Sequence, residues 1–430
     1  VAEEGAGMTW AYGYEYRMRL HITPGGIVGS IEEIGSSNAY RIEYAFSGDY
    51  VGSGRPVLVS SGLHASYSTY RAEIAATAQP PKPPAAKAYT LPPMSSVRRK
   101  ATGFFRVEKI GDRWWVIDPK GYAFYVVGTD HVNYYAHWCE KLGYAPYSRN
   151  VQARYGSEER WAASAAARLK QWGFNTLGAG HSESVRYRGL AHTVFLTLGA
   201  SFTAYGDIAP RTTWTGFPDV FDPRWPEYCA IEARRQCAPH RNDPWLLGYF
   251  LDNELEWFGK NGSETGLVDE AMKKPAGHPG KAAFVAMLRQ KYGTPERLNE
   301  AWKTGYTSWD ELAAATQIPS QGAAVLRDRL EFVRKIAERY FTATCKAIRE
   351  ADPNHMILGC RFAGFAPPIW DIAGAHLDTV SVNYYGTVDL ERGTTTDMPA
   401  AMARYHAQAR RPLMITEWSF PALDAGLPCL

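Results

Sequence analysis

Apolar residues recur along this chain in two different patterns, and the change from one to the other divides the sequence into two parts. Residues 14–22 and 40–46 alternate apolar and polar side chains without a break. A period of two is typical of strands that bury one face and expose the other, as in an antiparallel sheet. Glycine-containing turns separate these stretches. We therefore predict a small antiparallel β domain, of the sandwich type, over residues 1–78.

From residue 123 onward the chain changes to short apolar runs that alternate with longer amphipathic stretches. The apolar runs occupy residues 123–128, 174–178, 192–199, 245–251, 356–361, 379–385 and 412–416. The amphipathic stretches, which have helical spacing, occupy residues 157–172, 281–292, 295–302, 309–315 and 325–350. Strands that are buried on both faces and alternate with helices predict a parallel sheet with right-handed crossovers.

These repeated units predict an α/β fold, a (β/α)8 TIM barrel, over residues 99–430. Seven strands are evident, and the chain stops at Leu430 before an eighth. An open, doubly wound sheet is the alternative; it is less favoured because polar residues follow almost every apolar run, rather than gathering at one switch point. In the helix at 157–172 we expect Trp161, Leu169 and Trp172 on the apolar side.

Residues 79–98 are rich in proline and cannot continue a sheet or a helix, so we predict a semi-rigid extended linker. A hairpin is expected directly after it, with strands at 104–108 and 114–118 and a turn at 118–121. Whether the N-terminal domain binds carbohydrate or braces the larger domain stays open, with bracing preferred.

Composition excludes several partners. The net charge is +3 over 430 residues, too mild and too evenly spread to favour nucleic acid, and no apolar run reaches the about 20 residues needed to insert into a membrane. The six cysteines show no zinc-type spacing; Cys229 and Cys237 form either a disulfide or two buried thiols. The chain begins at Val1 without a signal peptide, so a processed, secreted or periplasmic protein is our expectation. The oligomeric state is not predicted.

Candidate chemistry lies where two of the apolar runs end in carboxylates. The run at 245–251 stops in Asp252-Asn253-Glu254, and the run at 412–416 stops in Glu417, which Trp418 follows. In a parallel barrel both would lie at the same, carboxyl-terminal face. Two carboxylates on either side of a sugar bond are the usual equipment of glycoside hydrolysis. The alternative is that Asp252 or Asn253 only caps a following helix.

These residues resemble a known family. Stretches beginning at Trp114 (WWVIDPKG), Leu169 (LKQWGFNT), Gly248 (GYFLDNEL) and Ile415 (ITEWSF, then DAGLP) are similar to the β-agarases of glycoside hydrolase family 50. The stretch from Tyr292 to Trp302 resembles the family 42 β-galactosidases more distantly. Both families belong to a clan of retaining glycosidases with (β/α)8 barrels and glutamates after strands four and seven. The resemblance covers residues from about 100 to 430.

The resemblance implies a role for each matching residue. Glu254 is expected to be the general acid/base and Glu417 the nucleophile, with retention of configuration. Asn253 is expected to reach the sugar 2-hydroxyl. Tyr385, or less favourably Tyr384, is expected to hydrogen-bond the nucleophile. The implied substrate is an oligo- or polysaccharide with β-galactosidic linkages, of the agarose type.

Other strand ends supply further candidates for the sugar pocket. His131, Asn133, His181 and Asn383 follow or end strands, although single histidines are more often structural than ligand-binding. Arg361 is either the partner of a strand-end carboxylate or part of a surface ion pair.

Aromatic and acidic neighbours of the two glutamates are the remaining candidates. Trp257, Trp418 and Trp214 offer faces for sugar stacking, Trp418 being the best placed. Glu256 would share the face of Glu254 on an extended segment, or would belong to the start of the next helix.

Three functions remain open at this stage. They are an agarase-like hydrolase, a β-galactosidase or other β-glycanase of the same clan, and a catalytically silent carbohydrate-binding protein. No HExxH or calcium-loop pattern occurs in the sequence, so we expect neither a metal nor another cofactor.

Overall fold

The structure is a computed structural model, and the chain divides into two units, Val1–Ala85 and Ala86–Leu430. It describes residues 2–4, 15–23, 26–36, 39–45, 88–212, 215–386, 388–389, 391–395 and 397–418. The predictions that concern residues 46–87, Trp214 and the DAGLP stretch lie outside these residues. The boundary between the units falls inside the predicted linker.

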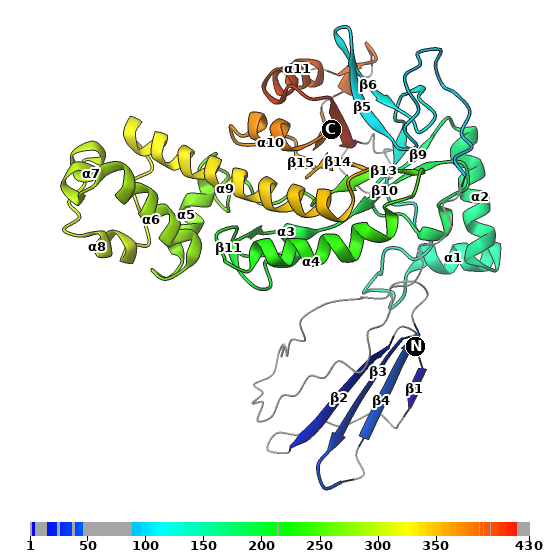
Figure 1. The fold of residues 1–430 in the computed structure, drawn as a ribbon, viewed down its shortest axis with the longest axis horizontal. Helices are drawn as coiled ribbons and strands as arrows, with labels where there is room; N and C mark the ends of the chain where they lie inside the picture. Colours follow the sequence, from blue (N-terminus) through cyan, green and yellow to red (C-terminus); the bar gives the residue numbers. More distant parts are fainter. Residues whose placement is uncertain are drawn as a thin grey trace. The chain divides into compact units, whose positions relative to one another are not determined.

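The first unit contains a four-stranded antiparallel sheet in the order β1-β4-β3-β2 (Figure 1). Its strands are β1 (Ala2–Glu4), β2 (Tyr16–Thr23), β3 (Gly26–Glu33) and β4 (Ala39–Ala45). The antiparallel pairing agrees with the alternating pattern of β2 and β4. The strand β3 was not predicted; Gly26 and Gly29 weaken its apolar alternation, and it is formed by pairing with β2 and β4 on both sides.

The second unit is built on parallel strands that follow one another in chain order. The strands are β8 (Gly128–Thr129), β9 (Thr176–Leu177), β10 (Ala191–Phe195), β13 (Leu246–Phe250), β14 (Met356–Gly359), β15 (Phe362–Ala363), β16 (Val380–Asn383) and β19 (Leu413–Glu417). One sheet has the order β14-β13-β10-β9-β8 and the other β15-β16-β19. Since only Cys360 and Arg361 separate β14 from β15, the strands occupy seven successive positions in chain order.

Helices connect these strands, and the predicted amphipathic stretches account for five of those listed next. They are α1 (Pro146–Tyr155), α2 (Glu158–Gln171), α3 (Leu198–Phe202), α4 (Trp225–Cys237), α5 (Gly266–Lys273), α6 (Pro279–Tyr292), α7 (Pro295–Trp302), α8 (Trp309–Ala314), α9 (Ala323–Ala351), α10 (Trp370–His376) and α11 (Met398–Ala409). The long helix α9 runs beside α4, and α5 to α8 form a helical extension at one end (Figure 1). No helix in the described ranges combines the length and the apolar character that crossing a bilayer would need.

Short antiparallel pairs complete the second unit. They are β5 (Arg106–Ile110) with β6 (Arg113–Ile117) and β7 (Ala123–Phe124), β11 (Asp207–Ala209) with β12 (Phe217–Pro218), and β17 (Val388–Asp389) with β18 (Thr394–Thr395). The predicted pairing of the two hairpin strands is confirmed, with residues 111–112 between them. The predicted turn at 118–121 instead connects β6 to β7, and there Asp118 accepts from the Tyr122 amide at 2.8 Å.

Several local predictions were wrong. The run at 123–128 is not one strand: Ala123–Phe124 pairs antiparallel with β6, and only Gly128–Thr129 enters the parallel sheet. The run at 192–199 ends as a strand at Phe195, because α3 begins at Leu198. Trp172 is 65% exposed, since it lies at the C-cap of α2, where the helix face no longer meets the sheet.

The last part of the predicted linker packs against neighbouring parts of the second unit. The Tyr89 ring lies 5.0 Å from that of Trp245 and 5.6 Å from that of Phe105. The Trp245 indole donates to the Ala88 carbonyl at 3.2 Å, and Lys120 donates to that of Leu91 at 3.1 Å. Aromatic contacts and hydrogen bonds therefore hold this end of the linker in place.

The core of the second unit lies between the sheet and its helices. The ring of Trp225, on α4, stacks on that of Tyr340, on α9, with 6.1 Å between centroids, and both side chains are fully buried.

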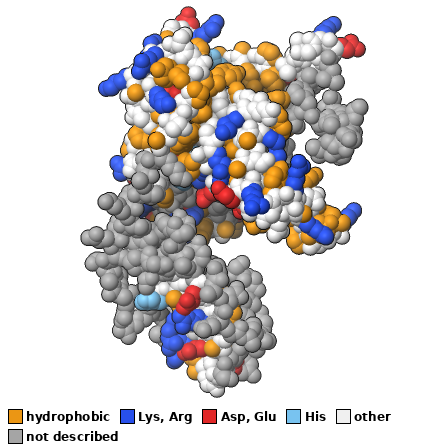
Figure 2. Space-filling view, turned by 90° about the vertical axis from the view of Figure 1, so that its right-hand side faces the viewer, with side chains coloured by type: hydrophobic (Ala, Val, Ile, Leu, Met, Phe, Trp, Pro, Cys, Tyr) orange, Lys and Arg blue, Asp and Glu red, His pale blue; other side chains and the backbone are white. Residues whose placement is uncertain are grey.

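On the face shown in Figure 2, Lys and Arg side chains are scattered among apolar ones rather than gathered in one basic patch.

We predict that Gly374→Ala destabilises this unit, because α10 approaches the end of α11 too closely for a side chain. A Cβ at Gly374 would lie 1.8 Å from the Ala409 carbonyl oxygen, whereas a Cβ at Gly277 would meet no atom within 4 Å. Overpacking of this kind costs about 1–3 kcal/mol. Urea denaturation followed by tryptophan fluorescence should show a lower midpoint for Gly374→Ala and an unchanged one for Gly277→Ala. Equal midpoints would contradict the close approach.

Candidate active site

The carboxyl ends of the parallel strands bring the predicted acidic residues to one face of the second unit. Asp130 follows β8, Asn253 and Glu254 follow β13, and Glu417 ends β19. Asn383, the last residue of β16, is the register partner of Glu417. Side chains that are far apart in sequence therefore meet, as the strand-end argument predicted.

Glu417 receives hydrogen bonds on both carboxylate oxygens. Arg361 donates through Nη2 to Oε1, and the Tyr385 hydroxyl donates to Oε2 at 2.5 Å. The Glu417 side chain is 21% exposed, so it reaches the surface of the site. Arg361 and Tyr385 hold its carboxylate in place. Hydrogen bonds from a charged donor are the strong ones, and they fix the direction of this carboxylate.

Glu254 has a different environment, made of neutral groups. Its Oε1 accepts from the Asn383 amide at 3.0 Å, and the same amide nitrogen lies 3.1 Å from Asn253 Oδ1. Asn383 is 1% exposed, and its own oxygen accepts from the Thr416 hydroxyl at 2.8 Å. One buried amide therefore links Glu254 and Asn253 to the strand that carries Glu417.

Arg361 lies in the interior, which excludes the surface ion pair. It is 1% exposed, and its Nη2 donates to Asp130 Oδ2 at 2.8 Å as well as to Glu417. The guanidinium carbon lies 5.3 Å from the ring centroid of Phe250 and 5.9 Å from that of Phe195. Burial raises the pKa of Asp130 from its ordinary value, although the charge of Arg361 opposes this change.

Tyr385 is affected by the negative charges of both glutamates. Its pKa is raised, first by burial of the phenol, then by the hydrogen bond to Glu417 and by the negative charges of Glu417 and Glu254. The phenol therefore remains a donor at neutral pH.

The backbone at this face is strained at several points. Positive φ angles occur at His131 (57°), Thr197 (55°), Glu254 (49°) and Arg361 (51°), four of eight such non-glycine residues in the described chain. Left-handed conformations are costly for these residue types and cluster at functional sites. At Glu254 and Arg361 the turn out of the strand aims the side chain into the site.

A cavity of about 450 Å³ opens beside these groups. Its wall is formed by His131, Ala179, Gly180, Phe195, Thr197, Ala200, Ser201, Arg211, Asn253, Arg361 and Glu417. The lining combines hydroxyl, amide and charged groups with one aromatic face. Such a lining suits a polar ligand with apolar ring faces, and a sugar is such a ligand.

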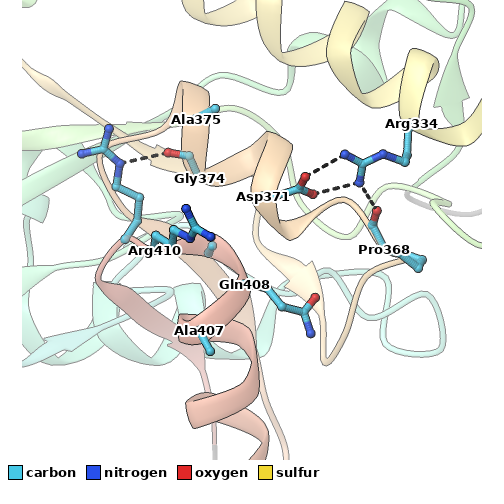
Figure 3. Close-up of a pocket in the computed structure, with 10 residues that line it drawn as sticks. Arg334, Pro368, Asp371, Gly374, Ala375, Ala407, Gln408 and Arg410 are labelled. Atoms are coloured by element: carbon cyan, nitrogen blue, oxygen red, sulfur yellow. Dashed lines mark hydrogen bonds and ion pairs between the residues drawn. The ribbon is translucent and has the colours of Figure 1, made fainter. Parts of the chain in front are cut away.

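A larger cavity of about 780 Å³ lies elsewhere, against α9, α10 and α11 (Figure 3). Arg334 there donates to both oxygens of Asp371, at 2.9 and 2.7 Å, and to the Pro368 carbonyl. These charges satisfy each other, and none of the predicted site residues lines this cavity. We therefore place the chemistry in the smaller cavity.

Asp252 is structural. It is fully buried and accepts from the amides of Gly199 (2.7 Å) and Ala200 (2.8 Å) at the start of α3, and from the Tyr340 hydroxyl (2.7 Å). Burial raises its pKa to about 6. Asp252 thus binds the start of a helix that precedes it in the chain, not one that follows it as the capping alternative had it, while Asn253 and Glu254 point to the site.

Two predicted aromatic contacts were wrong. Trp257 is 2% exposed and packs against Phe217, with 4.7 Å between ring centroids, so it has no free face for a sugar. Tyr384 is 8% exposed, and its hydroxyl donates to Asp397 at 2.6 Å instead of Glu417. Side chains of neighbouring strand residues point to opposite faces, and sequence alone does not say which face meets the core.

His181 and Glu256 are also placed outside the site. The His181 ring uses both nitrogens within the protein, donating from Nδ1 to the Gly178 carbonyl at 2.7 Å and accepting at Nε2 from Arg186 at 3.0 Å. Glu256 pairs with Lys260 at 2.8 Å. The positive φ of Glu254 ends the extended segment on which the two glutamates would have shared a face.

The remaining candidates lie at the rim. His131 is exposed and lines the cavity, and Asn133 lies next to the cavity residue Gly180. Trp418, directly after Glu417, is 59% exposed. These positions allow contact with a bound sugar.

The metal-ligating potential of the site is limited by Arg361. Ligand atoms of Asp130, His131 and Glu417 lie within 4.8 Å of one another. However, the guanidinium of Arg361 donates to both carboxylates, so a positive charge already lies between them. The cluster is built as a salt-bridge network.

Some lining residues were missed. Asp130 follows a strand and precedes His131, so the strand-end rule applied to it as well as to its neighbour. Thr197 and Ser201 belong to a segment predicted partly as strand. Arg211 comes from a loop between short strands, and a single sequence gives no pattern for such a position.

Comparisons with known proteins show that the chain is similar to glycoside hydrolases. The family model of the glycoside hydrolase family 42 β-galactosidases matches residues 227–422. Beta-agarase B of Vibrio sp. (strain JT0107) is 27% identical over 401 residues, covering 76% of this chain and 40% of that protein. Beta-agarase A of the same strain is 29% identical over 295 residues, covering 65% of this chain and 29% of that protein.

The solved structure of an agarase, AgWH50C, superposes with a TM-score of 0.62 at 26% identity, covering 76% of this chain and 54% of that one. The chain is thus related to the family 50 agarases, with the family 42 β-galactosidases as more distant relatives. The chain spans less than half of the length of the two Vibrio agarases.

We predict that His181 stabilises the fold less as the pH falls. Burial and the charge of Arg186 lower its pKa from 6.5 to about 3 in the folded protein. Between these values the unfolded chain binds a proton that the folded chain does not, so this contribution is complete above pH 6.5 and falls toward pH 3. The stability difference between the wild type and His181→Gln, from urea denaturation at pH 7, 5.5 and 4.5, should therefore shrink. A constant difference would argue against a neutral, structural histidine.

Proposed function

We propose that this chain carries the catalytic barrel of a retaining glycoside hydrolase that cleaves β-galactosidic linkages in agarose-type galactans. In this proposal the second unit is a (β/α)8-type barrel and the smaller cavity receives the sugar. The observation that supports it best is the unequal environment of two glutamates at one face. Glu417 is held by a cation and a phenol, and Glu254 only by a neutral amide.

Those environments assign different roles to the two residues. A carboxylate fixed by charged and strong donors is suited to act as the nucleophile. A carboxyl group beside a neutral amide, with no cation bonded to it in the described residues, is suited to give and take a proton. Glu417 is accordingly the nucleophile, and Glu254 is the general acid/base.

The reaction then proceeds in two displacements. A carboxylate oxygen of Glu417 attacks the anomeric carbon, the glycosidic C–O bond breaks, and Glu254 gives its proton to the leaving oxygen. Glu254 next takes a proton from water while that water attacks the anomeric carbon and releases Glu417. Two inversions restore the original configuration. Asn253, whose side chain lines the cavity, is placed to bind a sugar hydroxyl.

The substrate class rests on the relatives. Two agarases of Vibrio share sequence with most of this chain, and the family 42 model, described as β-galactosidase, covers both glutamates. A β-galactosidic bond is common to both groups of enzymes. An agarose-type galactan is the more specific choice, because the agarases match over the greater part of the chain.

We predict that Glu417→Ala lowers hydrolysis by more than about 10⁴-fold, because it removes the nucleophile. Glu254→Gln should lower it by about 10²–10⁴-fold. The measurement is reducing-sugar release from agarose, agaro-oligosaccharides and aryl β-galactosides, with proton NMR for the anomer first formed. The control Glu331→Gln, on the exposed side of α9, should retain full activity.

Several outcomes would revise the proposal. If only the aryl β-galactoside is cleaved, the agarose assignment falls. If the first product has the inverted configuration, Glu417 is not a nucleophile. If wild type cleaves none of these substrates but binds galactans, the chain is a carbohydrate-binding protein.

We predict that Tyr385→Phe lowers kcat/KM by about 10–100-fold, since a hydrogen bond to a charged group contributes about 1.5–3 kcal/mol. Tyr384→Phe is the matched control, because that neighbouring phenol donates to Asp397 and not to Glu417. Equal kinetic effects in both variants would show that the Tyr385 hydroxyl does not act through Glu417.

A further inference from the structure

Asp130 has a contact pattern that the proposed reaction does not explain. Its Oδ1 accepts from the Ala179 amide at 2.9 Å, and its Oδ2 accepts from Arg361 Nη2 at 2.8 Å. The same Nη2 donates to Glu417 Oε1. One guanidinium nitrogen is thus shared by two carboxylates that come from the ends of β8 and β19.

The surroundings of Arg361 strengthen its interaction with the two carboxylates. The Arg361 nitrogens Nε and Nη1 are buried and have no hydrogen-bond partner among the residues that the structure describes, and the guanidinium lies beside the rings of Phe250 and Phe195. Neither carboxylate can be satisfied by a second nitrogen of this arginine. In a poorly solvated site, charges at this distance interact much more strongly than in water.

We propose that Asp130 is a positioning residue that sets the charge balance at Glu417, by competing with it for Arg361. The proposal rests on the proposed role of Glu417 as nucleophile. A nucleophile bound to an uncompensated arginine would be held too firmly in its anionic form to attack well. The negative charge of Asp130 weakens that hold, and its bond to the Ala179 amide fixes Arg361 in place.

Other titratable or charged groups face the same pair. They are His131 and Tyr385, within contact range of Glu417, Glu254 across the site and Arg211 on the cavity wall. All of them are common to wild type and to a variant at Asp130. A difference between the two pH profiles therefore isolates the charge of Asp130.

The test is the pH dependence of kcat/KM for Asp130→Asn on an aryl β-galactoside or agaro-oligosaccharide, from pH 3 to 9. Loss of the neighbouring negative charge should move the acid limb to lower pH by about one unit, because an anionic Glu417 then forms more easily. The plateau should fall about tenfold. A lower plateau with an unmoved acid limb would show a merely structural role and overturn the proposal.

Asp378 offers a matched control at the opposite end of the strands. Its Oδ2 also accepts from an arginine Nη2, that of Arg349, and from a backbone amide, that of Ile357 at 2.7 Å. Asp378→Asn should leave the acid limb in place. An equal movement of the limb in this control would overturn the proposal, because the shift would then not be specific to Asp130.

A second variant and a second measurement keep the proposal testable. Asp130→Ser removes the charge without placing an amide NH₂ against Arg361, and it replaces Asp130→Asn if that variant does not fold.

If wild type is inactive on every substrate, the proposed function fails, but the charge balance can still be measured. Carbon-13 NMR of labelled glutamate, assigned with Glu417→Gln, should show Glu417 titrating at lower pH in the Asp130 variant. An unchanged midpoint would refute the proposal.

Discussion

One buried guanidinium, that of Arg361, determines the electrostatics of the candidate site. A charge with 1% exposure is tolerated only when it is paired, so Asp130 and Glu417 must stay beside it. These carboxylates come from the ends of β8 and β19, the first and last parallel strands described. The ion network therefore holds together two strand ends that no described backbone ladder joins.

The same network separates the properties of the two glutamates. Glu417 belongs to the charged group around Arg361, whereas Glu254 is bonded to the neutral Asn383 amide. Asn383 is the register partner of Glu417 and also binds Glu254, so the strand β16 fixes the positions of both glutamates. Two carboxyl groups with unequal surroundings on a fixed framework are what acid/base and nucleophilic roles require.

Much of the fold was predictable, because burial imposes periodicity on the sequence. The bounds of α2, α6, α7, α8 and α9 agree with the predicted stretches to within two residues. The order of the parallel strands also follows from alternating apolar runs and helices. The weakest predictions concerned short strands such as β8, since two residues carry no period. There the pairing partner, and not the local pattern, decides the structure.

The sequence by itself determined which residue types end the strands, and hence that Asn253, Glu254 and Glu417 share one face. Only the tertiary structure decided which neighbours join them. The side chains of Trp257 and Tyr384 are buried in the core. Both ring nitrogens of His181 are hydrogen-bonded within the protein, one to the backbone and one to Arg186. Asp130 belongs to the site although it was not predicted. The physical reason is that strand order is encoded locally by burial. Side-chain direction, by contrast, depends on backbone turns and partners supplied by distant segments.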